Sequence, residues 1–379
     1  MVTEERIILI GNYLPDKQES MIRFAFLLNS GFLNAGVSSE IWWPTRLFGS
    51  KAKVTNSGTG KWLGYFDKYI VFPLVLSWRV RKRKFNNTRF HVCDHSNAPY
   101  LKYLPANRSS ITCHDVIAIR GGLGYSDSYQ PASKLGRFLQ NWILHHLKKA
   151  RSIAFVSQLS LNQFKDLVED EVLEQKNWRV IHNSFNADFN PMDRTKAKEI
   201  LSKEKINLEV PFLLHVGSDL PRKNRKLLLD MVAILRQEQK INLCLAGEGM
   251  NNGLLAYARA LNLQNNLLQV VKPNHQTLVA LYTLCDAFIF PSLSEGFGWP
   301  LIEAQACGAP VIASNVEPMP EVSGGAALHF DPTQAKDFAK GYQDLQNQNL
   351  REELIKKGFE NCSRFHKKQM VSAYLNLYN

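Results

Sequence analysis

Short apolar segments and amphipathic stretches alternate along the whole chain. Apolar segments typical of buried strands, such as residues 6–10 and 287–290, are each followed by a loop rich in Gly, Asn or Asp and then by a stretch with helical periodicity. Strands that alternate with helices form parallel sheets covered by helices. The pattern therefore predicts an α/β protein built from Rossmann-like units.

The repeating pattern is interrupted near the middle of the chain. Residues 183–191 are rich in Asn, Asp and Pro, which are turn formers. A chain of 379 residues is long enough for two domains with substantial cores. We therefore expect one domain over residues 1–185, a second over 186–358, and a final helical segment over 359–379.

Charge separates the two predicted domains. The chain has a net charge of +12, and residues 1–185 contain 25 Lys and Arg against 14 Asp and Glu, so nearly all of the excess lies there. A basic half indicates an anionic partner such as a phospholipid headgroup, a lipid-diphosphate acceptor or a nucleic acid. Because no nucleic-acid recognition motif occurs, we expect no nucleic-acid partner.

The densest positive charge follows an apolar segment, residues 70–78. The cations are Arg79, Arg81, Lys82, Arg83 and Lys84. Two interpretations stay open: the solvated end of a crossover helix, or a patch that docks on anionic lipid or borders the acceptor. A neighbouring segment, residues 46–64, is rich in Gly, Ser and Thr, and we expect a mobile loop there. Further along the chain we expect a turn at residues 121–124 and a loop at 318–321.

Several features point to a cytoplasmic protein. The N-terminus carries acids before its first strand, unlike a secretion signal, and no apolar run approaches the ~20 residues that span a bilayer. The six cysteines are scattered without metal-binding spacing, so we expect reduced thiols and no metal cluster. If the basic patch binds lipid, the protein would be peripheral on the inner face of the membrane.

The most informative stretch is residues 290–314. It predicts a loop after a buried strand, a short helix that opens with Pro300, and a second strand. Backbone N–H groups at such a helix start form an anion site, and ligands of open α/β sheets bind at the carboxyl ends of strands. Glu295 and Glu303 are placed to accept hydrogen bonds from sugar hydroxyls. Together these features indicate a nucleotide sugar.

This stretch resembles the signature of the retaining family-four glycosyltransferases. The matching residues are Glu295-Gly296-Phe297-Gly298, Pro300, Glu303-Ala304, Gly308 and Pro310-Val311. The resemblance implies the GT-B fold, in which two Rossmann-like domains face each other across a cleft that holds the donor. It also implies that the last helix crosses back to the first domain.

The resemblance assigns roles in the second domain. Lys223, with Arg222 beside it, would contact the donor diphosphate, and the loop at Lys272 would approach the nucleobase. Glu303 would bind the ribose and Glu295 the sugar. The other expected donor contacts are Ser218, Gly296, Phe297 and Gly298.

Two residues of the first domain complete the expected site. Gly11 follows the first strand, in a loop that in the resembling family faces the donor diphosphate and sugar. His114 ends another strand, and family members often carry a His there that reaches the transferred sugar. With Lys223 and Glu295, His114 is an expected catalytic residue. Asp115 either orients His114 or caps the next helix.

The function expected from the resemblance is a retaining hexosyltransferase that uses GDP-mannose or a UDP-hexose and a glycan or lipid-linked acceptor, in cell-envelope or exopolysaccharide synthesis. No Asp-x-Asp pair occurs, so we expect no obligatory metal and no cofactor besides the donor substrate. The alternatives are a non-catalytic lipid-docking or regulatory GT-B protein, and a GT-B phosphorylase or synthase.

Overall fold

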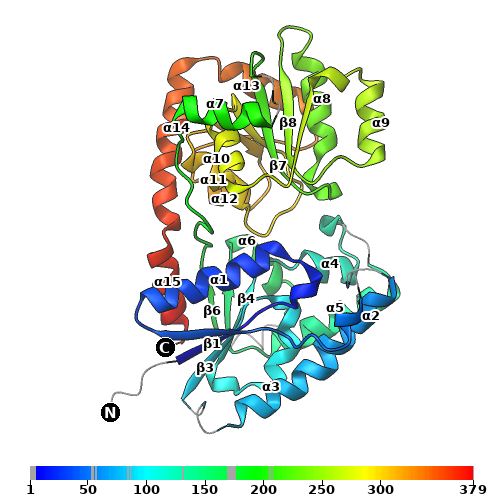
Figure 1. The fold of residues 1–379 in the computed structure, drawn as a ribbon, viewed down its shortest axis with the longest axis vertical. Coiled ribbons are helices and arrows are strands. Elements are labelled where there is room, and N and C mark those ends of the chain that lie inside the picture. Colours follow the sequence, from blue (N-terminus) through cyan, green and yellow to red (C-terminus); the bar gives the residue numbers. More distant parts are fainter. Residues whose placement is uncertain are drawn as a thin grey trace. The chain divides into compact units, whose positions relative to one another are not determined.

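A computed structural model describes residues 6–52, 55, 58–82, 85, 87–129, 132–168, 176–204, 206 and 208–378. The chain forms two compact units (Figure 1). Unit 1 contains the chain up to Asn186 and again from Lys367, and unit 2 spans Ala187–His366. The turn-rich segment thus contains the first division, and the second falls at residue 367 rather than at residue 359.

Unit 1 is built on a six-stranded parallel sheet with the order β2-β1-β3-β4-β5-β6. Its strands are β1 (Arg6–Ile10), β2 (Ser38–Trp42), β3 (Thr88–Val92), β4 (Ser109–Cys113), β5 (Ser152–Phe155) and β6 (Asn177–Val180). Its main helices are α1 (Glu19–Asn34), α2 (Gly58–Phe66), α3 (Phe72–Val80), α4 (Ile117–Leu123), α5 (Lys134–Lys148), α6 (Gln158–Lys165) and α15 (Lys367–Tyr378).

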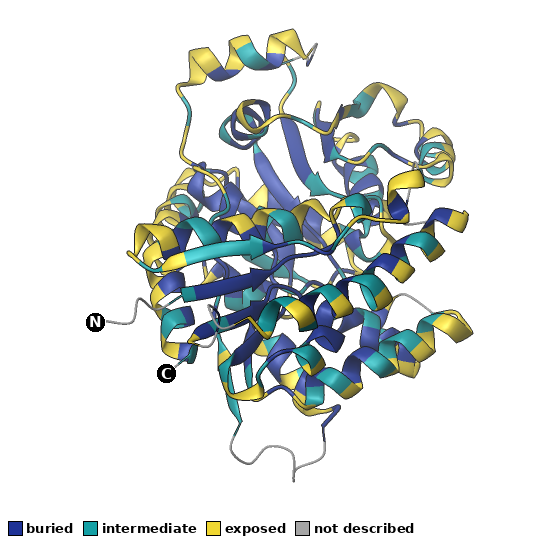
Figure 2. Cartoon of the chain, turned by 60° about the horizontal axis from the view of Figure 1, so that its bottom comes forward, coloured by how far each residue is buried: buried dark blue, intermediate teal, exposed yellow. Residues whose placement is uncertain are grey.

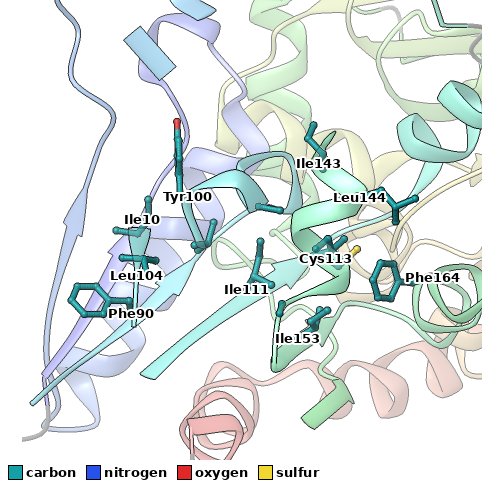
Figure 3. Packing of buried hydrophobic residues seen from close by; sticks show 14 of the residues in the cluster. Ile10, Phe90, Tyr100, Leu104, Ile111, Cys113, Ile143, Leu144, Ile153 and Phe164 are labelled. Atoms are coloured by element: carbon teal, nitrogen blue, oxygen red, sulfur yellow. The ribbon is translucent and has the colours of Figure 1, made fainter. Parts of the chain in front are cut away.

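The two faces of this sheet carry different helices. Only the crossover from β1 to β2 runs toward one edge, so right-handed connections place α1 on one face and α3, α5 and α6 on the other. The core on the second face joins the strands to these three helices, and Figure 3 shows Ile111, Ile143 and Phe164, from β4, α5 and α6, in this layer. Helix α15 contacts α1.

Unit 2 repeats the architecture with the order β12-β11-β10-β7-β8-β9. Its strands are β7 (Phe212–Gly217), β8 (Asn242–Gly247), β9 (Leu267–Val271), β10 (Ala287–Phe290), β11 (Val311–Ser314) and β12 (Leu328–Phe330). Its helices are α7 (Arg194–Lys203), α8 (Arg225–Leu235), α9 (Asn252–Ala260), α10 (His275–Leu284), α11 (Trp299–Ala306), α12 (Met319–Ser323), α13 (Ala335–Asp344) and α14 (Gln348–Cys362). The prediction of two Rossmann-like parallel sheets is confirmed.

Three local expectations were wrong. Part of the expected loop 46–64 is helix α2, in which a Cβ on Gly64 would lie 3.2 Å from the Thr55 side chain. Residues 121–124, expected to be a turn, mostly belong to α4, and a Cβ on Gly122 would lie 2.7 Å from Gln140 of α5. In both segments glycine permits close packing rather than a flexible loop. The expected loop 318–321 overlaps the short helix α12.

The described part of the chain contains neither disulfides nor helices that could span a membrane. All six cysteines are free, and five of them are buried. No helix among the described residues has both the length and the hydropathy that crossing a bilayer requires.

Candidate active site

The carboxyl ends of β7 and β10 form the centre of the candidate site in unit 2. These strands are neighbours, with β8 and β9 on one side and β11 and β12 on the other. The strand order therefore reverses between β7 and β10, which is where open α/β sheets bind their ligands. The loop after β7 carries Arg222 and Lys223, and the loop after β10 carries Glu295.

The ion-pair cluster of Arg222, Lys223 and Glu295 brings these two loops together. Glu295 accepts a hydrogen bond from Lys223 Nζ at 2.6 Å and one from Arg222 Nη1 at 2.7 Å. Lys223 and Glu295 are buried, and Arg222 is partly buried. The cluster carries a net charge of +1, so it remains able to attract an anion after its internal pairing.

Burial and charge compete in setting the protonation of this cluster. Burial alone would raise the pKa of Glu295, but the neighbouring Lys223 and Arg222 lower it to about 2. Burial lowers the pKa of the Lys223 ammonium, an effect that the charge of Glu295 opposes. Glu295 is therefore an ionised carboxylate that holds the two cations in place.

The glycine-containing loop ends at an α-helix that begins with a left-handed residue. Gly298 has φ +99°, and a Cβ there would lie 3.3 Å from the Phe290 ring. Pro300 occupies the first turn of α11, where its missing N–H costs no helical hydrogen bond. Among the predicted contacts Gly296, Phe297 and Gly298, the Phe297 side chain is buried and packs on the Phe365 ring at 5.7 Å.

The remaining predicted donor residues of unit 2 lie at different positions and differ in burial. Glu303 lies buried in α11 and accepts a hydrogen bond from the Tyr282 hydroxyl at 3.0 Å. Ser218 is half-buried in the loop after β7. Lys272 is exposed directly after the edge strand β9, two strands from β7.

Two buried residues that the sequence did not reveal support the cluster. Arg225 donates to the backbone oxygens of Gly217 and Glu248, at 2.8 and 2.9 Å, and so ties the loops after β7 and β8. His215 donates from Nδ1 to Ile289 O, and its Nε2 has no hydrogen-bond partner among the described residues. Burial lowers the pKa of His215 to about 3, so the ring is neutral beside Lys223. Neither role was visible in the sequence, because His215 lies inside a strand and Arg225 is an ordinary residue in the first turn of a helix.

Unit 1 holds the other two predicted residues at the corresponding edge of its sheet. Gly11 follows β1, and a Cβ there would lie 2.3 Å from the Trp43 ring, so close packing accounts for this glycine. His114 is buried at the end of β4, where its Nε2 donates to Cys93 O at 2.9 Å. A carbonyl oxygen can only accept, so Nδ1 carries the lone pair. Burial lowers the pKa of His114 and favours this neutral ring.

A polar network surrounds the β1 and β3 ends in unit 1. Asn12 donates to Asp94 at 2.5 Å and accepts from Asn97 at 3.1 Å. Asp115 accepts from the Ile117 N–H at 3.0 Å, at the start of α4, which favours the capping role expected for it. Asp94 was not singled out from the sequence, although it follows a strand directly.

The basic patch is partly involved in packing. The Arg79 guanidinium lies 5.3 Å from the centre of the Trp42 ring, and Lys82 Nζ lies 3.5 Å from the centre of the Trp78 ring. Arg81 is exposed at the end of α3. Arg83 and Lys84 lie outside the described residues.

Comparison with known proteins relates this geometry to glycosyltransferases. Residues 196–361 match the family model "Glycosyl transferases group 1". The chain is 27% identical over 287 residues to the O-antigen chain mannosyltransferase B of Escherichia coli, covering 73% of this chain and 72% of that protein. It is 29% identical over 259 residues to the E. coli serotype-specific mannosyltransferase WbdA. That match covers 65% of this chain but only 30% of the longer WbdA.

Solved structures with low sequence identity share the fold. A sucrose-phosphate synthase from Thermosynechococcus elongatus superposes with a TM-score of 0.74 at 17% identity, covering 99% of this chain and 98% of that one. Anabaena Alr3699/HepE, solved in complex with UDP and glucose, gives a TM-score of 0.70 at 13% identity, with 98% of both chains covered. Residues 196–361 thus match the group 1 glycosyltransferases, and the chain as a whole shares the GT-B fold of the family-four type.

Proposed function

We propose that this glycosyltransferase moves a hexose, with retention of the anomeric configuration, from a nucleoside-diphosphate sugar to a glycan or lipid-linked acceptor in cell-envelope or exopolysaccharide synthesis. The ion-pair cluster at the β7/β10 switch point carries the proposal. Its two cations come from a loop that opens a helix, and its carboxylate is ionised at neutral pH. A diphosphate needs the cations, and a sugar hydroxyl can use the carboxylate.

The proposed reaction breaks the bond between the anomeric carbon and the β-phosphate oxygen. The acceptor oxygen attacks from the same face, and its proton passes to the departing diphosphate. Lys223 and Arg222 would stabilise the charge that develops on that oxygen, the contribution that usually dominates such catalysis. Because these cations and the start of α11 supply positive charge, we propose that transfer needs no divalent metal and persists in a chelator.

The relatives narrow the donor and the acceptor class. Two of them are mannosyltransferases by name, and one acts on O-antigen chains, which favours GDP-mannose and a growing cell-envelope glycan. HepE was solved with UDP-glucose, so a UDP-hexose is the alternative donor. His114 would hold the transferred sugar through the lone pair of Nδ1.

Ligand binding tests the donor assignment. GDP-mannose, UDP-glucose and UDP-N-acetylglucosamine are screened by thermal shift and calorimetry, because a donor that binds the native state raises its apparent stability. We expect one nucleotide class to bind, and Lys223→Ala to weaken that binding at least tenfold. Lys336→Ala is the matched control, since Lys336 is exposed on α13.

Product analysis completes the test. Proton NMR of the product from an α-linked donor should show an α-linked hexose. The proposal fails if no nucleotide sugar binds, if Lys223→Ala binds as the wild type does, or if the product is β-linked.

A further inference from the structure

An apolar ridge runs along one side of unit 1. Helix α2, the π-helical turn η3 (Asp67–Val71) and α3 follow each other without interruption. Between positions 62 and 78 this segment exposes five side chains to solvent, and all five are large and apolar. The ridge residues are Trp62, Phe66, Ile70, Leu74 and Trp78, exposed by 58%, 45%, 50%, 67% and 62%.

The pattern differs from that of an ordinary surface helix. Such a helix turns its apolar side chains to the core and its polar ones to water. Here the opposite side is also apolar, with Phe72 and Leu76 fully buried in the core of unit 1. Exposed residues, such as those of the ridge, are drawn in yellow in Figure 2. An apolar patch exposed in this way is typical of a surface that binds a partner or a membrane.

The spacing and the π-helical turn keep these side chains together. The ridge residues recur every four positions. Because a turn of a pure α-helix takes 3.6 residues, side chains at this spacing would shift steadily around the helix axis. A π-helical turn holds more residues and advances less per residue, so η3 brings Leu74 and Trp78 back toward the side of Trp62.

The buried side chain of Asp67 holds a loop whose apolar residues extend the ridge. Asp67 accepts hydrogen bonds from the Tyr13 hydroxyl and from the backbone N–H groups of Leu47, Phe48 and Gly49. These bonds fix the loop so that the Phe48 ring packs on Phe66 at 4.9 Å, with Leu47 exposed by 52% beside it.

Among the described residues of the ridge segment the exposed charges are all positive, and the half-buried Lys68 pairs with Asp16 at 2.7 Å. Residues 58–84 contain seven Lys and Arg and a single acid, Asp67, which is fully buried. Lys61 is exposed at one end of the ridge, and Arg81 and Lys82 are exposed at the other. Aromatic ends, an apolar middle and flanking cations are the composition of segments that lie in the headgroup region of a bilayer.

A basic pocket adjoins the same side of unit 1. Trp142 of α5 packs on Tyr69 at 5.1 Å and also lines a cavity of about 430 Å³. The titratable side chains that line the cavity are Lys102, His145, His146, Lys149 and Arg151. This lining holds no acid, and it suits an anionic headgroup.

We infer that the ridge is a docking surface for the anionic phospholipid surface of a membrane. Trp62 to Trp78 enter the headgroup region, and Lys61, Arg81 and Lys82 contact lipid phosphates. Docking on this surface would keep unit 1 beside a lipid-linked acceptor. The inference does not depend on which donor the protein uses.

Vesicle binding tests the inference on the full-length protein without nucleotide sugar. Co-sedimentation is measured with vesicles of phosphatidylcholine alone and with vesicles containing 30–40% phosphatidylglycerol, on the order of the anionic content that polybasic segments sense. We expect binding to the anionic vesicles only. Leu74→Ser/Trp78→Ser and, separately, Arg81→Gln/Lys82→Gln should each weaken it roughly tenfold or more.

The matched control is Phe26→Ser/Leu33→Ser. These residues are exposed by 55% and 51% but belong to α1, on the other face of the sheet. The control should bind vesicles as the wild type does, and the ridge variant should bind the donor unchanged. The inference is overturned if the wild type ignores anionic vesicles, if the ridge variant binds like the wild type, or if its only change is loss of a dimer in light scattering.

Discussion

Glu295 keeps Lys223 and Arg222 in position before any donor arrives. A cation fixed in this way costs little reorganisation when charge develops on the leaving diphosphate, and removing one such group typically costs 10²–10³-fold in rate. We therefore predict that Lys223→Ala lowers kcat/KM roughly 100-fold in steady-state transfer assays. Circular dichroism should show an unchanged fold.

A second substitution at Lys223 separates the effect of its charge from the effect of its position. Lys223→Arg keeps the positive charge but changes its geometry, so it should retain more activity than Lys223→Ala. Lys336→Ala should match the wild type. Turnover of Lys223→Ala within a few-fold of wild type would contradict the assignment of Lys223 to the diphosphate.

Buried neutral histidines predict how stability depends on pH. Burial lowers the pKa of His215 and of His91 to about 3, whereas an unfolded chain has an ordinary value of about 6.5. Below pH 6.5 the unfolded state therefore gains protons that the folded state does not bind. Each residue should cost about 2 kcal/mol between pH 7 and pH 5.

Denaturant unfolding at several pH values measures this effect. Stability should fall steadily from pH 7 toward pH 5, before carboxylates such as Glu295 protonate in the unfolded chain. Replacing His215 by Gln should remove about half of the loss that the two histidines cause. An unchanged slope in His215→Gln would show that its ring is already protonated in the folded protein.

At the scale of elements, the start of α11 depends on one backbone conformation. Gly298 has φ +99°, and its Cβ would press on Phe290. Gly298→Ala should therefore lower the free energy of unfolding by about 1–3 kcal/mol and weaken donor binding, because the glycine-containing loop would shift. Gly249→Ala is the control, since its Cβ would meet nothing closer than 3.7 Å. Equal stability of both variants would contradict this role.

The sequence predicted elements wherever apolar periodicity was strong. Both parallel sheets, and the loops at their carboxyl ends, followed from apolar segments separated by turn residues. The errors at α2 and α4 arose because Gly64 and Gly122 were interpreted as flexible. Whether a glycine permits a turn or a close helix contact depends on the neighbour, here Thr55 and Gln140, which no local pattern reveals.

The candidate site was predicted as a set of residues but not as a network. Arg222 and Lys223 were expected on the donor diphosphate and Glu295 on the sugar, whereas the structure joins all three in one ion-pair cluster. Their pairing joins residues more than 70 positions apart and depends on β7 and β10 being neighbours. Arg225 stayed hidden because its shortest hydrogen bonds go to backbone oxygens, which every residue carries.

At the scale of the whole molecule, the chain leaves unit 1 after Asn186 and returns to it at Lys367. The returning helix α15 is part of the core of unit 1 rather than an appendage. Tyr374 is fully buried, its hydroxyl hydrogen-bonds Thr112 Oγ1 at 2.9 Å, and its ring packs on His91 at 5.2 Å. The carbonyl oxygens of Leu377 and Tyr378 accept from Asn177 and Arg89.

This chain path predicts that the last residues decide the stability of the first unit. Tyr374→Ala should lower the stability of unit 1 by about 3–5 kcal/mol, because a large buried ring is lost, whereas Tyr374→Phe loses one hydrogen bond and about 1 kcal/mol. Differential scanning calorimetry of the full chain should show the transition of unit 1 moving down, and donor binding should still raise the transition of unit 2. If Tyr374→Ala instead lowers only the donor-sensitive transition, α15 does not stabilise unit 1.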